Sequence, residues 1–311
     1  MARLRAAFSA IVAWLRAGDA RLMGSGWYRI VRNTIVGFNR RRGQRSAAAM
    51  TYFAVFSIFP FILLMIALLS FLVDSAEAQR QVVGALSEFL PVGSTGIQSV
   101  IRGVIEARGV AVGFGVVLLL WGALGWFQAI DQGVNEMWGV TASRPFPWGQ
   151  LFALGMIGGI GLVMMLSWAA NIAVGIVRAL TESLGLGALP GAAAFWDFVV
   201  GSVTMAVMFV LFCLLYRWSP MCDIGWREVW PGALVTAALW SALRSGFAVY
   251  VVHFANYQSA YGSIGAVIAF LAWLYLAHMV ILFGARLTYT MRLESQGVRD
   301  PVDLPCGMAQ G

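Results

Sequence analysis

Long apolar segments without a charged residue alternate with short polar segments along this chain. The uncharged runs are Ser46–Val73, Gly109–Ile130, Pro145–Val177, Phe198–Tyr216 and Ser245–Ala285. Each exceeds the roughly 18 apolar residues that suggest a helix across a bilayer. The last run has 41 residues, which is too long for one helix across a hydrocarbon core of about 30 Å at about 1.5 Å per residue.

The last run therefore needs a turn, which the polar stretch Asn256–Ser263 with Gly262 supplies. The pattern then predicts an all-α fold, a polytopic membrane helix bundle with about six transmembrane helices. Pro60 lies within the first span, where it removes a backbone hydrogen bond and is expected to kink the helix. The expected spans of this transmembrane domain, residues 46–287, are 46–73, 109–128, 148–172, 197–216, 230–252 and 264–286.

Amphipathic segments accompany these spans. In the N-terminal region, residues 1–45, apolar side chains recur at helical spacing and predict a helix that lies at the membrane interface. The apolar face consists of Trp27, Ile30, Val31, Thr34, Ile35 and Phe38, and the polar face of Arg29, Arg32, Asn33 and Arg40. The loop 74–108 carries two further apolar stripes and is expected to form two short amphipathic helices on the outer membrane face. The tail 288–311 is expected to be disordered.

Composition supports a membrane protein. Of the 311 residues, 60% are hydrophobic and 11% are charged, whereas an ordinary soluble domain has roughly a quarter of its residues charged. The formal net charge is +7, and every basic residue is Arg. Sixteen arginines fall in the segments on one side of the predicted spans and four on the other side. Because basic residues are retained on the cytoplasmic side, this distribution predicts that both termini are cytoplasmic.

The arginines beside the first span give the positive charge a role at the membrane surface, so no nucleic-acid partner is needed to explain it. Arg40, Arg41, Arg42 and Arg45 directly precede that span. Near a membrane surface, each such residue contributes about 1 kcal/mol to the attraction of anionic lipid headgroups. We expect a topology anchor here, with specific lipid recognition as the alternative. The expected partners are membrane lipids and an unknown solute, with no nucleic acid, and an oligomer is left open.

Two ionisable residues lie inside predicted spans, where charge is costly and often functional. Arg244 either contacts Trp273 or a water-filled cavity, or extends its long side chain to the outer interface. His278 either forms an interhelical hydrogen bond, the reading we favour, or takes part in a proton relay. The third span also carries Gly155-x-x-x-Gly159, whose small residues let another helix approach, within one chain or between chains.

The sequence contains no pattern that indicates catalysis. The two histidines, His253 and His278, belong to no HxH, HxxE or DxD cluster, the kind of grouping that metal-dependent phosphodiester cleavage needs. Neither a glycine-rich phosphate loop followed by Lys nor a GxSxG nucleophile elbow occurs. We therefore expect no enzymatic activity, no catalytic residue, no bound metal and no cofactor.

A series of motifs occurs in order between residues 28 and 293. Its members are Tyr52, Pro60, Asn135, Trp138, Pro231, Gly232, Tyr261, Gly262, Trp273, Tyr275 and Gly284. This series resembles the YihY/BrkB family of six-helix bacterial inner-membrane proteins, formerly labelled ribonuclease BN. The resemblance implies a multi-pass protein of the bacterial inner membrane that is not a ribonuclease. Arg286 stands where family members usually have an acidic residue, so no role for a carboxylate at that place is carried over.

The leading hypothesis for function is a transport or permeation protein of unknown substrate, and the resemblance adds a role in envelope integrity. The candidate substrate or permeation residues are Arg244, His278, Trp273, Tyr275 and Asn135. The first alternative is a non-transporting scaffold that organises envelope lipids or proteins. The second alternative is a ribonuclease, as the old family label suggests.

Overall fold

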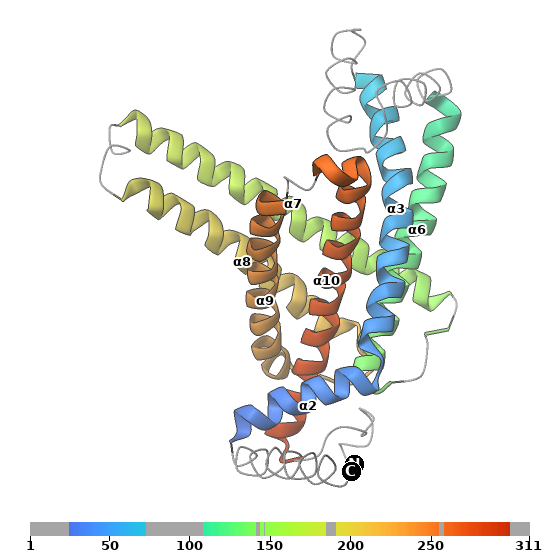
Figure 1. Ribbon diagram of the computed structural model, residues 1–311, viewed down its shortest axis with the longest axis vertical. Helices are drawn as coiled ribbons and strands as arrows, with labels where there is room; N and C mark the ends of the chain where they lie inside the picture. The colour runs from blue at the N-terminus through green and yellow to red at the C-terminus, as the bar shows by residue number, and fades with distance from the viewer. Residues whose placement is uncertain are drawn as a thin grey trace.

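The computed structural model describes residues 25–72, 108–140, 144–145, 147–184, 191–254 and 258–298, which form long helices and short connections (Figure 1). No strand occurs within these ranges, so the predicted all-α fold class is confirmed. The helices are α2 (Gly26–Arg40), α3 (Gly43–Leu72), α6 (Arg108–Met137), α7 (Trp148–Ser183), α8 (Ala192–Trp218), α9 (Trp226–Phe254) and α10 (Gln258–Ser295).

Four helical segments among the described residues are long and apolar enough to cross a membrane. They are Trp148–Ser183, Ala194–Trp218, Trp226–Tyr250 and Val267–Ser295. The first two expected spans coincide with α3 and α6, each a helix of 30 residues, although only part of their side chains is described. A membrane helix bundle is therefore supported, and the number of six spans stays a prediction.

Several helices run beyond the predicted spans. α6 continues to Met137 and α7 to Ser183, whereas the predicted spans end at residues 128 and 172. We limited each span to the thickness of the hydrocarbon core, but backbone hydrogen bonds continue a helix into the headgroup region as well. The segment from Asp131, predicted as a polar connection, is therefore helical as far as Met137.

The predicted turn Asn256–Ser263 and the predicted disordered tail 288–311 both include residues that are helical in the structure. α10 begins at Gln258, so Tyr261 and Gly262 are helical and not part of a turn, because a Gly costs a helix only about 1 kcal/mol and does not end it. α10 also continues to Ser295, and Tyr289 and Leu293 are fully buried. Residues 288–295 are therefore an ordered part of the bundle, held by this burial.

The predicted kink at Pro60 and the predicted helices of the loop 74–108 are not tested by the described part of the structure. α3 continues as a helix through Pro60 to Leu72, and the side chain of Pro60 is not among those described, so the kink stays a prediction. The amphipathic pair expected in the loop 74–108 lies outside the described residues, except for Arg108 at the start of α6.

α2 lies across one end of the bundle, against the last turns of α10 (Figure 1). We call this the α2 end. The predicted amphipathic helix is present, but its assumed faces are partly wrong, because Asn33 of the polar face is buried together with Thr34 and Phe38 of the apolar face. Trp27 and Ile35 remain exposed. One side of α2 therefore packs against the rest of the bundle, and the other side exposes apolar side chains such as those of Trp27 and Ile35.

Polar and aromatic contacts explain this orientation of α2. Arg29 Nε donates a hydrogen bond to Glu294 Oε1 of α10 at 3.0 Å, and this bond raises the pKa of the Arg29 guanidinium. Phe38 packs edge-on against Phe283, with ring centres 6.0 Å apart. The charged end of α10 thus provides a partner for the polar face of α2. In an isolated interfacial helix this polar face would contact water.

Two glycines of the motif series let α8, α9 and α10 approach closely. A Cβ atom at Gly232 of α9 would collide with Thr288 of α10, and a Cβ at Gly284 of α10 would collide with Thr236 and Tyr216. Tyr216 is fully buried and donates a hydrogen bond to the Ile281 carbonyl at 2.8 Å. These glycines therefore have a packing role, and neighbouring Pro231 lies within α9.

The glycine motif of the third predicted span behaves differently. α7 and α8 form a pair that leans away from α3, α6 and α10 (Figure 1). The most apolar window of α7 has no buried residue, and a Cβ at Gly155 or Gly159 would meet no atom within 4 Å. This glycine face is therefore not used for packing within the described part of the chain.

The contrast between the two glycine faces predicts different responses to the same substitution. Gly284→Ala should lower the free energy of unfolding by about 1–3 kcal/mol, because the added methyl group overfills a packed contact. Gly155→Ala is the matched control and should leave stability unchanged or slightly higher, because Ala favours helix more than Gly does. Thermal unfolding in detergent measures both, and equal effects would contradict the packing described here.

Candidate functional site

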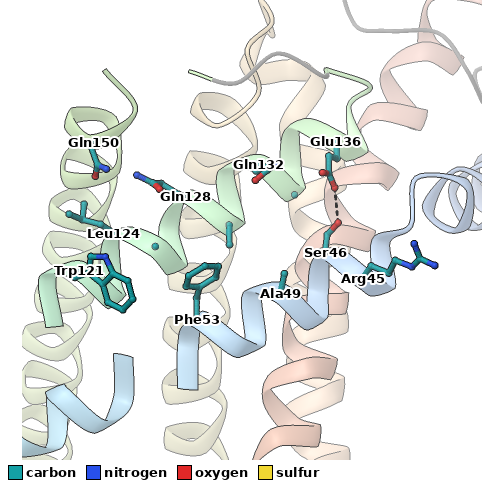
Figure 2. Close-up of a pocket in the computed structure, with 13 residues that line it drawn as sticks. Arg45, Ser46, Ala49, Phe53, Trp121, Leu124, Gln128, Gln132, Glu136 and Gln150 are labelled. Carbon is teal, nitrogen blue, oxygen red and sulfur yellow. Dashed lines mark hydrogen bonds between the residues drawn. The ribbon is translucent and has the colours of Figure 1, made fainter. Parts of the chain in front are cut away.

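A cavity of about 510 Å³ lies between α3, α6 and the first turn of α7 (Figure 2). We call it the α3–α6 cavity. Its lining residues are Arg45, Ser46, Ala49, Phe53, Trp121, Leu124, Gly125, Gln128, Ala129, Gln132, Gly133, Glu136 and Gln150. The close approach of α3 and α6 beside it depends on Gly125, where a Cβ would lie 3.0 Å from Phe53. A sizeable pocket with several convergent polar groups is the default candidate for a binding site.

Polar side chains of α6 form a stripe along this cavity. Gln128, Gln132 and Glu136 occur four residues apart, so they share one helix face. Ser46 of α3 donates a hydrogen bond to Glu136 Oε2 at 2.7 Å, and Arg41 Nη1 donates to the Glu136 carbonyl at 3.3 Å. The stripe is thus tied to α3 at the α2 end, while the two glutamine side chains are exposed.

A second cavity of about 340 Å³ adjoins the first on the other side of this stripe. We call it the α6–α7 cavity, and it shares Gln128, Gln132 and Gln150 with the α3–α6 cavity. Its remaining lining residues are Phe127, Asp131, Asn135, Arg144, Gly149, Phe152, Ala153 and Met221. Three neutral amide side chains therefore stand where the two cavities meet, and each amide can both donate and accept hydrogen bonds.

An ion pair forms one wall of the α6–α7 cavity. Arg144 Nη1 lies 2.6 Å from Asp131 Oδ1, and Ser219 Oγ donates to the same oxygen at 2.6 Å. Arg144 also donates to the carbonyl groups of Trp218 and Ser219, at 3.1 Å each, and lies over the Phe152 ring at 3.5 Å. Every charged group of this wall has a partner, so the wall is a structural element of the cavity.

Asn135, a candidate substrate residue, lies in the same wall. Its side chain is buried and donates to the carbonyls of Asp131 and Ser219, while its Oδ1 accepts a hydrogen bond from the Met221 amide at 2.9 Å. All of these partners belong to the protein. These hydrogen bonds of Asn135 therefore hold α6 against the segment that joins α8 and α9. Whether Asn135 also contacts a substrate stays a prediction.

Buried arginines stabilise the α2 end beside this wall. Arg286 is fully buried, and its Nη1 donates to the carbonyl of Met137, the last residue of α6, at 2.9 Å. A cation at this position stabilises the negative end of the helix dipole. Gly37 of α2 lies directly on the guanidinium, which a Cβ there would strike. Arg286 thus joins α2, α6 and α10.

Trp138 follows α6 and is packed into the same region. Its ring is fully buried, and its centre lies 5.3 Å from that of Tyr289 and 6.0 Å from the Arg292 guanidinium. Arg292 in turn lies 3.3 Å from Glu228 of α9. The motif residue Trp138 therefore contributes to the core at the α2 end and does not line either cavity.

His278 joins three helices. Trp126 Nε1 of α6 donates to His278 Nε2 at 2.9 Å, so that ring nitrogen is the acceptor. His278 Nδ1 lies 3.0 Å from Thr51 Oγ1 of α3, and the Thr51 hydroxyl donates to the Ala47 carbonyl at 2.8 Å. These bonds assign a neutral ring with its proton on Nδ1. Both nitrogens of His278 are thus used in interhelical contacts, and a part in permeation stays a prediction.

The other predicted permeation residues are not brought to these cavities. Arg244 is exposed on α9, and no ring contact joins it to Trp273 in the described part of the chain. Trp273 instead packs against Trp240 and Phe247, with ring centres 5.9 and 4.8 Å away, and Tyr275 packs beside the core. Tyr52 is exposed on α3 next to Phe53 and Phe56.

The four arginines predicted at lipid headgroups divide into two groups. Arg40, Arg42 and Arg45 are exposed, whereas Arg41 is half-buried and bonded to α6. Arg42 has a φ of 55°, a left-handed conformation that is uncommon for residues other than Gly, and it forms the turn between α2 and α3. Of these residues only Arg45 reaches the α3–α6 cavity.

The three glutamine residues and Glu136 were not among the predicted site residues. The signal was present, because polar residues at every fourth position of a helix share one face. It was overlooked because the predicted second span ended at Gln128, which assigned the later members to a connection. Gln150 was not recognisable at all, since only the packing of α7 brings it opposite α6 (Figure 2). Among the described residues, no group of three or more His, Cys, Asp or Glu side chains could hold a metal.

Comparison with known proteins matches residues 34–303 to the family model described as Virulence factor BrkB. A ribonuclease-like protein, YfkH, of Bacillus subtilis is 28% identical over 255 residues, which are 80% of this chain and 90% of that protein. UPF0761 membrane proteins of Chromohalobacter salexigens and Azotobacter vinelandii are 26% and 29% identical over 279 and 270 residues. These alignments cover 86% and 84% of this chain but 65% and 62% of those proteins. No solved structure matches.

The ion pair in the cavity wall predicts a large effect of neutralising its acid. Asp131→Asn should lower the free energy of unfolding by about 1–3 kcal/mol, because Arg144 loses its charge partner in a site where both side chains are 17% exposed. Glu182→Gln is the matched control, since Glu182 pairs with Arg178 at a site that is 43% and 55% exposed, and should change stability by less than about 0.5 kcal/mol. Thermal unfolding that ranks the two variants equally would argue against a structural ion pair.

The contacts of His278 predict a specific cost for removing one indole N–H. Trp126→Phe should lower the free energy of unfolding by about 1–3 kcal/mol, because the buried His278 Nε2 loses its donor. Trp168→Phe removes an indole that is 73% exposed on α7 and should have little effect. Chemical denaturation of both variants measures the difference, and the absence of any difference would contradict the assigned hydrogen bond.

Proposed function

Because this chain belongs to the BrkB family of membrane proteins, we propose that it is a transport or permeation protein whose substrate enters the α3–α6 cavity. The proposal includes a location in the bacterial inner membrane, with both termini cytoplasmic and a role in envelope integrity. The unequal distribution of arginines supports this orientation, and the α2 end of the bundle then faces the cytoplasm. The cavity accordingly opens from the cytoplasmic half of the membrane.

The observation that carries this proposal is the row of polar side chains beside the cavity. α6 is otherwise rich in apolar residues, yet Gln128 and Gln132 are exposed on it and both line the two cavities. Gln128 ends the expected span 109–128 and Gln132 follows it by one turn, and polar groups exposed at the boundary of an apolar bilayer tend to mark a substrate pathway. A structural role explains Asp131 and Asn135, whose partners belong to the protein, but it does not explain the exposed amides.

The Bacillus relative is named a ribonuclease-like protein, and we do not propose ribonuclease activity for this chain. Hydrolysis of a phosphodiester by metal ions requires clustered carboxylate or histidine ligands, and the described residues hold no such cluster. The charged groups of the α6–α7 cavity are engaged with each other and with backbone carbonyls. The polar cavity favours the passage of a molecule over its cleavage.

The proposal predicts loss of flux when the amides are removed. A Gln128→Leu/Gln132→Leu variant reconstituted in liposomes should move its substrate at least about tenfold more slowly than the unsubstituted protein, because two hydrogen-bonding side chains are lost from the pathway. The probes are radiolabelled phosphate, glycerol and glycerol 3-phosphate, and a phosphatidylglycerol with a fluorescent acyl chain. Uptake or change of leaflet is followed with time.

Gln296→Leu provides the control, because this glutamine is exposed after α10 and lines neither cavity. It should move the same probe at the unsubstituted rate. If no probe crosses faster than in protein-free liposomes, or if the double variant is as fast as the control, the assignment of this cavity to transport is wrong.

A further inference from the structure

Amide side chains gather at one end of the α3–α6 cavity, where it adjoins the α6–α7 cavity. Gln128 of α6 and Gln150 of α7 line both cavities and stand beside each other (Figure 2). Gln132, the third residue that lines both, lies one turn further along the same face of α6. Arg45 and Glu136 lie at the opposite end of the α3–α6 cavity (Figure 2). The junction of the cavities is therefore lined by neutral amides, away from these two charges.

One amide oxygen at this junction has no hydrogen-bond donor. Gln150 Oε1 is buried and forms no hydrogen bond in the described structure, while Gln128 and Gln132 are exposed. The terminal torsion of a glutamine side chain is broad, so rotation about it turns this oxygen toward the cavities. A buried acceptor without a donor is costly, and a hydroxyl group both donates and accepts hydrogen bonds. A hydroxyl between Gln150 and Gln128 would therefore satisfy the first amide and bond the second.

The charges that line the α6–α7 cavity balance each other. Its lining contains one acid and one base, Asp131 and Arg144, which form an ion pair at 2.6 Å. Both terminal nitrogens of Arg144 already donate hydrogen bonds, Nη1 to Asp131 and Nη2 to the carbonyls of Trp218 and Ser219. An ion that leaves water for this cavity loses its hydration and gains no counter-charge. The balance of charge therefore favours an uncharged solute.

Two aromatic rings supply apolar surface in the same cavity. Phe127 and Phe152 both line the α6–α7 cavity, and their ring centres lie 6.2 Å apart. The cavity has a volume of about 340 Å³, and pockets of about 300–1,000 Å³ hold small molecules by apolar contact and orient them with a few polar groups. A polyol has C–H groups that contact such rings and O–H groups that bond to amides. The lining therefore matches a small polyol.

From these features we propose that an uncharged polyol such as glycerol binds where the two cavities meet, with one hydroxyl between Gln128 and Gln150. Its carbon chain lies against Phe127 and Phe152. A phosphorylated polyol is excluded, because Arg144 has its partners within the protein. The inference rests on the proposed function, since it names the class of substrate that the cavities admit. Binding and transport are measured separately, so each can fail alone.

Competition between three related solutes tests this proposal on the full-length protein in lipid nanodiscs. Glycerol, 1,2-propanediol and glycerol 3-phosphate are titrated together, and the binding of each is followed by saturation-transfer difference NMR, with protein-free nanodiscs as the baseline. The diol lacks one hydroxyl of glycerol, and the phosphate ester adds charge. We expect glycerol to bind about three- to tenfold more tightly than 1,2-propanediol, the value of one hydrogen bond. It should bind at least about tenfold more tightly than glycerol 3-phosphate.

Two variants separate the hydrogen bond from the balance of charge. Gln150→Leu removes the acceptor and should bring the affinities for glycerol and 1,2-propanediol close together, while glycerol 3-phosphate stays excluded. Asp131→Asn leaves the charge of Arg144 unbalanced and should raise the affinity for glycerol 3-phosphate relative to glycerol by about threefold or more. Gln296→Leu and Glu182→Gln are the matched controls outside both cavities and should change neither ratio. Because each result is a ratio within one sample, a less stable variant still gives a usable value.

Equal binding of glycerol and 1,2-propanediol, tighter binding of glycerol 3-phosphate than of glycerol, or unchanged ratios in Gln150→Leu and Asp131→Asn would overturn the proposal. Such a result, together with flux of another probe that the Gln128→Leu/Gln132→Leu variant slows, would reject the polyol and keep the transport function. The expected ratios without flux of any probe above that of protein-free liposomes would reject transport and keep the binding site.

Discussion

Polar groups inside an apolar helix bundle must find their partners within the protein, and the α2 end is organised around this requirement. Arg286 binds the last carbonyl of α6, Arg144 binds Asp131 and the carbonyls of Trp218 and Ser219 at the end of α8, and Arg29 binds Glu294. Apart from the Arg144–Asp131 ion pair, each contact joins segments that are distant in sequence. Because an unpartnered buried charge is expensive, these contacts fix where α2, α6 and α10 meet.

The need of buried polar groups for partners within the protein separates structural polar residues from candidate functional residues. Asn135 and His278 use their side-chain hydrogen-bonding groups on protein partners, so their geometry is explained by the fold. Gln128 and Gln132 are exposed beside a cavity, and Gln150 presents an acceptor that no described residue satisfies. The candidate site is therefore the place where exposed amide side chains meet the two cavities.

Membership of the BrkB family does not decide the chemistry of this chain. Two of the relatives are named only as membrane proteins, and this chain spans less than two thirds of their length. The cavity lies in α3, α6 and α7, within the part that matches the family. Arg286, two residues after the last glycine of the motif series, has a structural role, since it holds the end of α6 against α2.

Hydropathy by itself determined the helical segments and the amphipathic character of the chain before α3, because both depend on the order of nearby residues. It did not determine where α6, α7 and α10 end, since a helix continues beyond the bilayer core whenever its polar turns find partners. The partners of His278, the face that α2 turns to α10 and the position of Gln150 depend on contacts between distant segments. Only the tertiary structure therefore decided that the amides of α6 line a cavity, because no local pattern specifies which helix will stand opposite them.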